Sequence, residues 1–175
     1  HSNALSVTEH QRNMSDEMLR LMAENGGVVQ MTLLSSYLRD EPPNPERSAA
    51  LEELRSSMKN AGVMTPEQRA KRRSAFNEIN ENFPTPLATV NHVVDHIDHM
   101  VSIAGIDHVG IGCDFDGGGG IDGVFDASEV MNITIELVRR GYSEEDIEKI
   151  WGKNVMRVFE EVQKVAEVIQ AKALS

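Results

Sequence analysis

GIDHVGIGCDFDGGGG, residues 105–120, is the stretch of sequence that decides the fold. It predicts a short buried strand over residues 107–112, whose end delivers Asp114 and Asp116 into a glycine-rich loop. A strand that ends in a carboxylate and then a flexible loop is how α/β enzymes present a catalytic acid or base. The stretch therefore predicts an α/β fold with a candidate active site at the end of this strand.

The same residues also allow interpretations other than an active site. Asp and Gly are the commonest turn residues, and Asp116-Gly117 alone would indicate only a turn. GGGGIDGVF, residues 117–125, fits one copy of a calcium-binding nonapeptide repeat, but such repeats bind calcium in stacked arrays and the sequence has no second copy. Asp114 and Asp116 also match the start of an EF-hand loop, although Phe125 stands where the closing Glu should be.

Composition narrows the class of protein. The 175 residues have the length of one domain, and a hydrophobic content of 40% is enough for a real core. The net charge of −11 argues against nucleic acid or an anionic membrane surface as a partner. The single cysteine, Cys113, allows no internal disulfide, and the sequence has no apolar run of about 18 residues that would span a membrane.

Hydrophobic spacing predicts helices on both sides of two strands. The first helix carries Met14, Met18, Leu21 and Met22, which we interpret as core residues, and a strand follows over residues 27–34. Further helices are predicted over residues 48–60, from 65 onward, and over 85–104, 127–140, 144–151 and 154–172. This alternation of helix and strand is typical of parallel α/β structure, although two strands cannot close a sheet.

Residues 38–85 interrupt the alternation. Pro42, Pro43 and Pro45 indicate an extended connection, which two helices follow. The second of these is predicted to start at residue 65, because TPEQ at 65–68 combines a capping box with proline at the first helical position. An insertion of this size between a strand and the next regular helix usually covers a site or makes an interface.

Three histidines on the helix predicted over 85–104 suggest a metal site. His92, His96 and His99 share one face, and the string HID beginning at His96 has the form HxD, which binds metal in many hydrolases. HxD does so on a strand, where residues two apart point the same way, whereas on a helix they diverge by about 200°. The favoured interpretation is therefore a half-exposed flank that hydrogen-bonds to Asp95 and Asp98.

Four ordered motifs carry a further signal: HSNA at residues 1–4, RN at 12–13, DHIDHMVSIAGIDHVGIGCDFDG at 95–117 and NVMRVF at 154–159. Together they resemble the renal (membrane) dipeptidase family, which consists of binuclear zinc peptidases on a (β/α)8 barrel related to the amidohydrolases. The resemblance implies that residues 1–175 are the C-terminal part of a single dipeptidase domain. That part would run from the end of the sixth strand through the eighth strand and the C-terminal helices of a TIM-like barrel, with a helical insertion at about 38–85.

The resemblance also implies roles for individual residues. His1 matches the zinc-ligand histidine at the end of the sixth strand, and Arg12 matches the arginine that binds the substrate's carboxylate. Asp114 matches the aspartate after the eighth strand, which contacts substrate and shuttles a proton. Tyr37 matches a tyrosine that lines the pocket, whereas Asp116 is expected to hold the loop.

The activity implied by the resemblance is zinc-dependent hydrolysis of dipeptides that have a free C-terminal carboxylate. Two zinc ions would share a hydroxide whose pKa they lower, which gives a nucleophile at neutral pH. A strand-end carboxylate can take its proton and pass it to the leaving amine, and a guanidinium suits a carboxylate because it binds in a bidentate manner. The implied partners are the dipeptide, the remainder of the barrel and, for the complete enzyme, a second copy in a homodimer.

Most of the family's metal ligands have no counterpart in this sequence. The family needs an HxD on the first strand, a bridging glutamate and a histidine on the fifth strand, and His1 alone cannot hold two metal ions. The alternative is a catalytically incomplete barrel fragment that acts as a binding or structural domain. Cys113, which has no assigned partner base, is interpreted as a packed small residue rather than a nucleophile.

Overall fold

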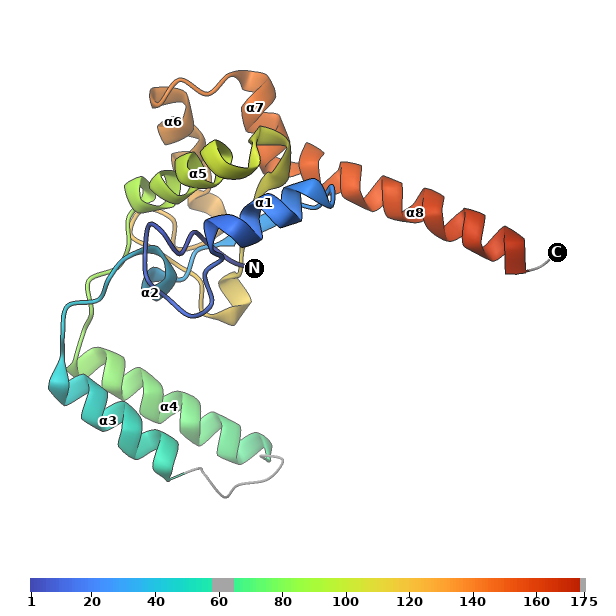
Figure 1. The fold of residues 1–175 in the computed structure, drawn as a ribbon. Coiled ribbons are helices and arrows are strands. Elements are labelled where there is room, and N and C mark those ends of the chain that lie inside the picture. Colours follow the sequence, from blue (N-terminus) through green and yellow to red (C-terminus); the bar gives the residue numbers. More distant parts are fainter. Residues whose placement is uncertain (58–64, 174–175) are drawn as a thin grey trace. The chain divides into compact units, whose positions relative to one another are not determined.

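The computed structural model describes residues 1–57 and 65–173, which divide into two compact units. The first unit comprises residues 1–40 together with those from 87 onward, and the second comprises residues 41–86. The bounds of the second unit lie close to those of the helical insertion predicted at about 38–85. Figure 1 follows both units along the chain.

A two-stranded parallel sheet is the frame of the first unit. β1 (Val29–Thr32) pairs with β2 (Val109–Cys113), with one irregularity of register just before Thr32. The parallel pairing confirms the α/β class that the sequence predicts. Both strands are shorter than their predicted ranges, and β2 starts late because a 3-10 turn, Ile106–His108, takes up the residues before it.

The first residues of the chain lie along the other edge of β1. The Ser2 N–H donates to the Gln30 carbonyl (3.3 Å), and the Asn3 side-chain amide both donates to the Thr32 carbonyl (3.0 Å) and accepts from the Thr32 N–H (3.1 Å). Residues two apart in a strand present their backbone groups to the same edge, so Gln30 and Thr32 share the edge that faces away from β2. The spatial order is therefore residues 1–3, then β1, then β2.

Helices cover this sheet. α5 (Val90–Ala104) packs against both α1 (Asp16–Glu24) and α6 (Met131–Arg139), and Figure 1 shows it between them. α5 begins five residues later than predicted, because Thr89 caps it. The fully buried core includes Leu19, Met31, Leu33, Val93, Ile97, Met100, Val109, Ile133 and Leu137.

The C-terminal part of the chain is helical. The helix predicted over 127–140 is in fact a 3-10 turn (Ala127–Glu129) followed by α6, and the next one, α7 (Glu144–Glu148), continues as a π turn over Lys149–Lys153. α8 (Asn154–Ala173) agrees with the predicted helix at its start and within a residue at its end. Asn154 is buried and donates to the carbonyls of Ile106 (2.7 Å) and Val109 (2.8 Å), which fixes the start of α8 to the start of β2.

Several apolar helix faces are exposed in this chain. Met18 and Leu21 of α1, which we expected in the core, are 55% and 57% exposed, and it is Leu19 that is buried. The side chains on α8 that are more than half exposed include Phe159, Val162, Val165, Val168 and Ile169. Helical spacing predicts that a face is apolar but does not say what covers it. No helix within residues 1–57 and 65–173 is both long and apolar enough to cross a membrane.

The second unit is a helical hairpin. α3 (Pro45–Ser56) packs against α4 (Pro66–Asn82), and the Arg47 side chain joins the start of one to the end of the other by donating to the Phe83 carbonyl (2.9 Å) and the Asn80 side chain (2.8 Å). The capping box predicted at residue 65 is confirmed. The predicted end of the first helix, residue 60, lies outside the described residues.

Candidate active site

β2 ends in two residues with left-handed backbone. Cys113 has φ 51° and Asp114 has φ 71°, a conformation that costs residues with a side chain roughly 1–3 kcal/mol each and that clusters at functional sites. Three short-range bonds hold it: the Asp114 N–H donates to the Gly112 carbonyl (2.7 Å), and the Asp114 carbonyl accepts from the N–H groups of Gly117 (3.1 Å) and Gly119 (2.8 Å). The chain thus turns at Asp114, directly after β2.

The glycine-rich loop is folded onto Asp114. A Cβ placed at Gly117 would overlap the Asp114 carboxylate, and one at Gly119 would lie 2.6 Å from the Asp114 carbonyl oxygen. Glycine is therefore required here for the loop to close over this aspartate. The run of glycines has a local steric reason that does not involve a calcium-binding repeat.

His1 and Asp114 come together beside β2. The His1 Nδ1 lies 3.8 Å from the Asp114 Oδ2, and the two side chains are 46% and 28% exposed. Gly112 makes this approach possible, because a Cβ at that position would lie 2.8 Å from the His1 Cδ2 and 3.1 Å from its Nε2. An imidazole and a carboxylate thus meet beside the end of β2, at a solvent-accessible point.

Arg12 returns to the same end of the sheet because the N-terminal segment closes on itself. The Met14 N–H donates to the Asn3 carbonyl (2.8 Å), and the Ser2 hydroxyl donates to the Arg12 carbonyl (2.6 Å). Arg12 itself is exposed, with its guanidinium carbon 5.8 Å from the centre of the Tyr37 ring. Its backbone is therefore fixed to the residue that follows His1.

Tyr37 lies on α2 (Ser35–Leu38), the short helix that follows β1 directly. The Tyr37 carbonyl accepts a hydrogen bond from the Asn13 side-chain amide (2.9 Å), which also donates to the Thr8 carbonyl (2.9 Å). The structure thus forms two pairs, His1 with Asp114 and Arg12 with Tyr37. Asp116 takes part in neither and lies in the 3-10 turn Phe115–Gly117.

His96 is a supporting residue whose role the sequence analysis missed. It is fully buried; its Nδ1 accepts from the Ala4 N–H (3.0 Å), and its Nε2 lies 3.2 Å from the Leu38 carbonyl and 3.3 Å from the Thr8 hydroxyl. Since Nδ1 is an acceptor, Nε2 carries the proton and donates to the carbonyl. Burial lowers the pKa of His96 to about 4, so the ring is neutral and joins the loop that bears Arg12 to the turn that bears Tyr37.

The histidines of α5 do not form a metal site together. The His92 Nδ1 accepts from the Thr89 N–H (3.1 Å) in the capping box of α5, and the His99 Nε2 lies 2.7 Å from the Asp16 Oδ1. The expected half-exposed flank is wrong for His96. The expected bonds to Asp95 and Asp98 are also wrong, because both carboxylates bind Arg140 instead.

Cys113 is half-buried, and burial raises the pKa of its thiol. A raised pKa lowers the thiolate fraction at neutral pH, which is the opposite of what a cysteine nucleophile requires. Cys113 also packs against the hydrophobic core. These observations agree with the interpretation of Cys113 as a packed small residue.

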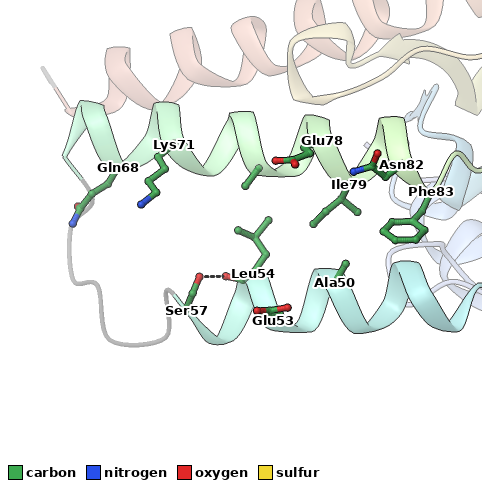
Figure 2. A pocket seen from close by; sticks show the side chains of 11 residues that line it. Ala50, Glu53, Leu54, Ser57, Gln68, Lys71, Glu78, Ile79, Asn82 and Phe83 are labelled. Atoms are coloured by element: carbon green, nitrogen blue, oxygen red, sulfur yellow. Dashed lines mark hydrogen bonds between the residues drawn. The ribbon is translucent and has the colours of Figure 1, made fainter.

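A large cavity lies in the second unit rather than at the predicted site. Figure 2 shows it between α3 and α4, where it has a volume of about 790 Å³. Leu54 and Ile79 face each other across it, and Glu53, Lys71 and Glu78 line it as well. None of the predicted site residues contributes to it, so we interpret it as a gap between two loosely packed helices.

An imidazole and a carboxylate that meet at the carboxyl end of β2, with an arginine on the loop that follows the His1 segment, are typical of an enzyme site in an α/β fold. The comparison with known families gives that site a more specific identity. The model of the membrane dipeptidase family (peptidase family M19) matches residues 1–173. The chain therefore belongs to the membrane dipeptidase family, as its four sequence motifs predict.

Individual relatives agree with this assignment. Dipeptidase ataJ from Aspergillus terreus is 34% identical over 173 residues, which cover 98% of this chain and 32% of the relative. The crystal structure of the probable dipeptidase PvdM from Pseudomonas aeruginosa superposes with a TM-score of 0.72 at 36% identity, covering 94% of this chain and 44% of that one. A metallo peptidase from Rhodobacter sphaeroides, solved with a phosphinate mimic of the dipeptide L-Ala-D-Ala, gives a TM-score of 0.63 at 26% identity and covers 91% and 34%.

This chain spans about a third of the length of the curated relatives that it matches. The members of the family that it resembles are dipeptidases and metallopeptidases, so it has a peptidase-family origin. Within residues 1–57 and 65–173 no three or more His, Cys, Asp or Glu side chains are grouped so that they could hold a metal ion.

Proposed function

We propose that this chain is the substrate-facing part of a zinc-dependent dipeptidase that hydrolyses dipeptides with a free C-terminal carboxylate. The observation that carries the proposal is the 3.8 Å approach of His1 to Asp114 at the carboxyl end of β2, in a chain that belongs to a dipeptidase family. An imidazole and a carboxylate in this position suit metal binding and proton transfer respectively.

The fold proposed for the complete protein is a TIM-like (β/α)8 barrel in which residues 1–175 form the C-terminal part of a single domain. Residues 1–3, β1 and β2 lie side by side in chain order, as the end of a sixth strand, a seventh and an eighth would. Among the described strands β2 pairs only with β1, which leaves its second edge for the first strand of the barrel. The helical hairpin of residues 41–86 would then be an insertion after the seventh strand.

His1 fits one position of a zinc site. Imidazole is a common zinc ligand, the His1 side chain is nearly half exposed, and the missing side chain at Gly112 leaves room beside the ring. The other ligands of two zinc ions would come from the rest of the complete protein. When bound, zinc would supply an activated water for attack on the peptide carbonyl.

The residues of this chain would carry out proton transfer and substrate binding. The Asp114 carboxylate accepts a proton as water attacks and delivers it to the leaving amine nitrogen, which completes the hydrolysis without a net change in the enzyme. The Arg12 guanidinium binds the C-terminal carboxylate of the dipeptide through charge-assisted hydrogen bonds. Tyr37, whose ring lies beside Arg12, lines the pocket and restricts where the guanidinium can move.

The Arg12→Ala variant of the complete protein tests this assignment. Because the lost charge-assisted pair is worth roughly 2–4 kcal/mol, the KM for a dipeptide should rise about 30- to 800-fold while kcat changes little. Steady-state kinetics on a dipeptide and its C-terminal amide, each with and without a chelator, provide the measurement. The control is Arg139→Ala, whose side chain is 72% exposed on α6. Equal loss of activity on the dipeptide and on its amide would contradict the role of Arg12.

A second candidate is a catalytically incomplete barrel fragment that acts as a binding or structural domain. The observation that favours it is the lack of a grouped set of metal ligands within the described residues. Chelator-sensitive hydrolysis by the complete protein would exclude it. Binding of a dipeptide without any zinc-dependent turnover would support it.

The complete protein is also proposed to be a homodimer, which its mass in solution tests.

A further inference from the structure

His10 contacts both members of the proposed carboxylate-binding pair. Its ring stacks on the Tyr37 ring with the centroids 4.2 Å apart and the planes 30° from parallel. Its Nδ1 accepts a hydrogen bond from the Arg12 backbone N–H (3.2 Å).

The surroundings of His10 fix its segment of backbone. The His10 carbonyl accepts from the Asn13 N–H (2.9 Å), and the Asn13 side chain is tied to the Tyr37 carbonyl (2.9 Å). Residues 10–13 therefore form a tight turn that is bonded to the Tyr37 backbone at one point and stacked on the Tyr37 ring at another. Arg12 lies inside this turn, so the hydrogen bond from the Arg12 N–H to the His10 Nδ1 helps to fix the position of the Arg12 backbone.

The chemistry of the imidazole suits this position. A neutral histidine that accepts at Nδ1 carries its proton on Nε2, so the backbone N–H of Arg12 also selects the tautomer. A planar ring stacked on Tyr37 limits the rotation of both aromatic side chains. Such pre-organisation strengthens binding because less side-chain freedom is lost when the ligand arrives.

We propose that His10 is a positioning residue for recognition of the substrate's C-terminal carboxylate. It holds Tyr37 and Arg12 in the arrangement that binds a carboxylate, and so sets the preference of the enzyme for free dipeptides over their amides. This inference rests on the proposed function, in which Arg12 binds that carboxylate.

Three variants of the complete protein separate the two contacts of His10. His10→Phe keeps a ring that can stack on Tyr37 but loses the Nδ1 acceptor. His10→Asn keeps an acceptor oxygen near the Nδ1 position but loses the ring, and His10→Ala loses both. His108→Ala is the matched control, because His108 is also half-buried and its Nδ1 lies 2.7 Å from a backbone carbonyl, that of Gly27, which precedes the strand.

The readouts are the ratio of kcat/KM for a dipeptide to that for its amide, and the Kd of the dipeptide measured in the Asp114→Asn background. His10→Ala should lower the ratio and weaken binding about three- to tenfold, with kcat changed by less than about twofold. His10→Phe and His10→Asn should each fall between His10→Ala and the parent protein. His108→Ala should leave both readouts unchanged, even if it lowers the melting temperature.

Measurements on Arg12→Ala in parallel show whether a negative result contradicts only the inference about His10 or also the proposed function. If Arg12→Ala lowers the ratio but His10→Ala leaves both the ratio and the Kd unchanged, the inference about His10 is wrong and the proposed function stands. A loss in His10→Ala that lies entirely in kcat would also overturn it. If the complete protein neither binds nor hydrolyses a dipeptide with Arg12, His10 and Asp114 all present, the proposed function fails and the inference fails with it.

Discussion

Asp114 combines a strained backbone with a partly exposed carboxylate. Its φ of 71° is tolerated because Asp and Asn are among the few side chains that visit the left-handed region, and the loop glycines fit closely around it. A structural turn would be made more easily with glycine at this position. A side chain retained at such a point is best explained by what the side chain does.

We predict that Asp114→Asn in the complete protein keeps the fold but loses turnover. Asparagine accepts the same backbone conformation, so the melting temperature should change little, whereas turnover should fall on the order of a hundredfold or more with the acid–base group gone. Asp116→Asn, in the neighbouring turn, is the matched control and should do less to kcat. If Asp116→Asn proved the more damaging with the fold intact, the wrong carboxylate would have been chosen.

Gly112 is predicted to be irreplaceable for a steric reason. In Gly112→Ala the new methyl would lie 2.8 Å from the His1 ring and 3.1 Å from the Gln30 Cβ, so His1 must move. We expect a loss of stability of about 1–3 kcal/mol together with a loss of activity in the complete protein. Gly152→Ala is the control, because a Cβ there meets no atom within 4 Å. Equal behaviour of the two variants in thermal unfolding and turnover would show that the space beside His1 is not needed.

At the scale of elements, His96 joins three segments behind the site: the residues after His1, the turn after β1, and α5 itself. Its buried neutral ring makes the junction sensitive to pH. The pKa of His96 is about 4 in the folded chain and about 6.5 for an unperturbed histidine, so the unfolded state binds the proton first as the pH falls. The stabilisation is complete above pH 6.5 and is lost as the pH drops from about 6.5 towards about 4.

We predict that this junction accounts for at most about 3 kcal/mol of the unfolding free energy between those pH values. The measurement is the difference in unfolding free energy between the complete protein and its His96→Asn variant, followed from pH 7.5 to pH 4. The parent should be more stable at pH 7.5, and the difference should shrink on acidification. A difference that stays constant or grows as the pH falls would mean that His96 is not held neutral. His92→Asn, at a half-buried position in the first turn of α5, serves as the control.

The elements that could be predicted from the sequence are those with local signals. The capping box at residue 65, the strand within residues 107–112 that becomes β2, and the start of α8 depend on residues a few positions apart, and the structure confirms them. The bracing role of His96 could not be predicted, because its partners Ala4 and Leu38 lie 92 and 58 residues away. The proximity of His1 and Asp114 followed from the resemblance, since no local pattern connects residues so far apart.

The same distinction holds for burial. The spacing along α1 and α8 indicates apolar faces correctly, but burial depends on which element lies opposite, and that is a property of the whole fold. Met18 and Leu21 are exposed for this reason, although they have the spacing of core residues.

At the scale of the whole molecule, the described residues leave much apolar surface uncovered. Helices α1, α6 and α8 all present large apolar side chains that are more than half exposed. Among the described strands, β2 has one hydrogen-bonded neighbour, although strands of a parallel sheet are normally paired on both sides and covered on both faces. Both features are expected if, as proposed above, the rest of a barrel packs here.

We therefore predict that the isolated 175-residue chain is molten or poorly soluble and binds zinc weakly, since one histidine and one carboxylate do not close a metal site. Near-UV circular dichroism, binding of a hydrophobic dye and denaturant unfolding provide the measurement. The complete protein, studied in parallel, should unfold cooperatively. Cooperative unfolding of the isolated chain as a monomer at micromolar concentration would show that no further polypeptide is needed.

The Val162→Lys substitution on α8 tests this prediction further. It should benefit the isolated chain but destabilise the complete protein. Val162 is 61% exposed in this chain, so a lysine should raise the solubility of the isolated chain without a structural penalty. In the complete protein the same position would be covered, and placing a charge there should destabilise the fold by about 2 kcal/mol or more. Gln163→Lys, at the next position of α8, is the control and should be nearly neutral in both. If Val162→Lys were as harmless as Gln163→Lys in the complete protein, the apolar face of α8 would be a true surface, and the partner that we infer for it would not exist.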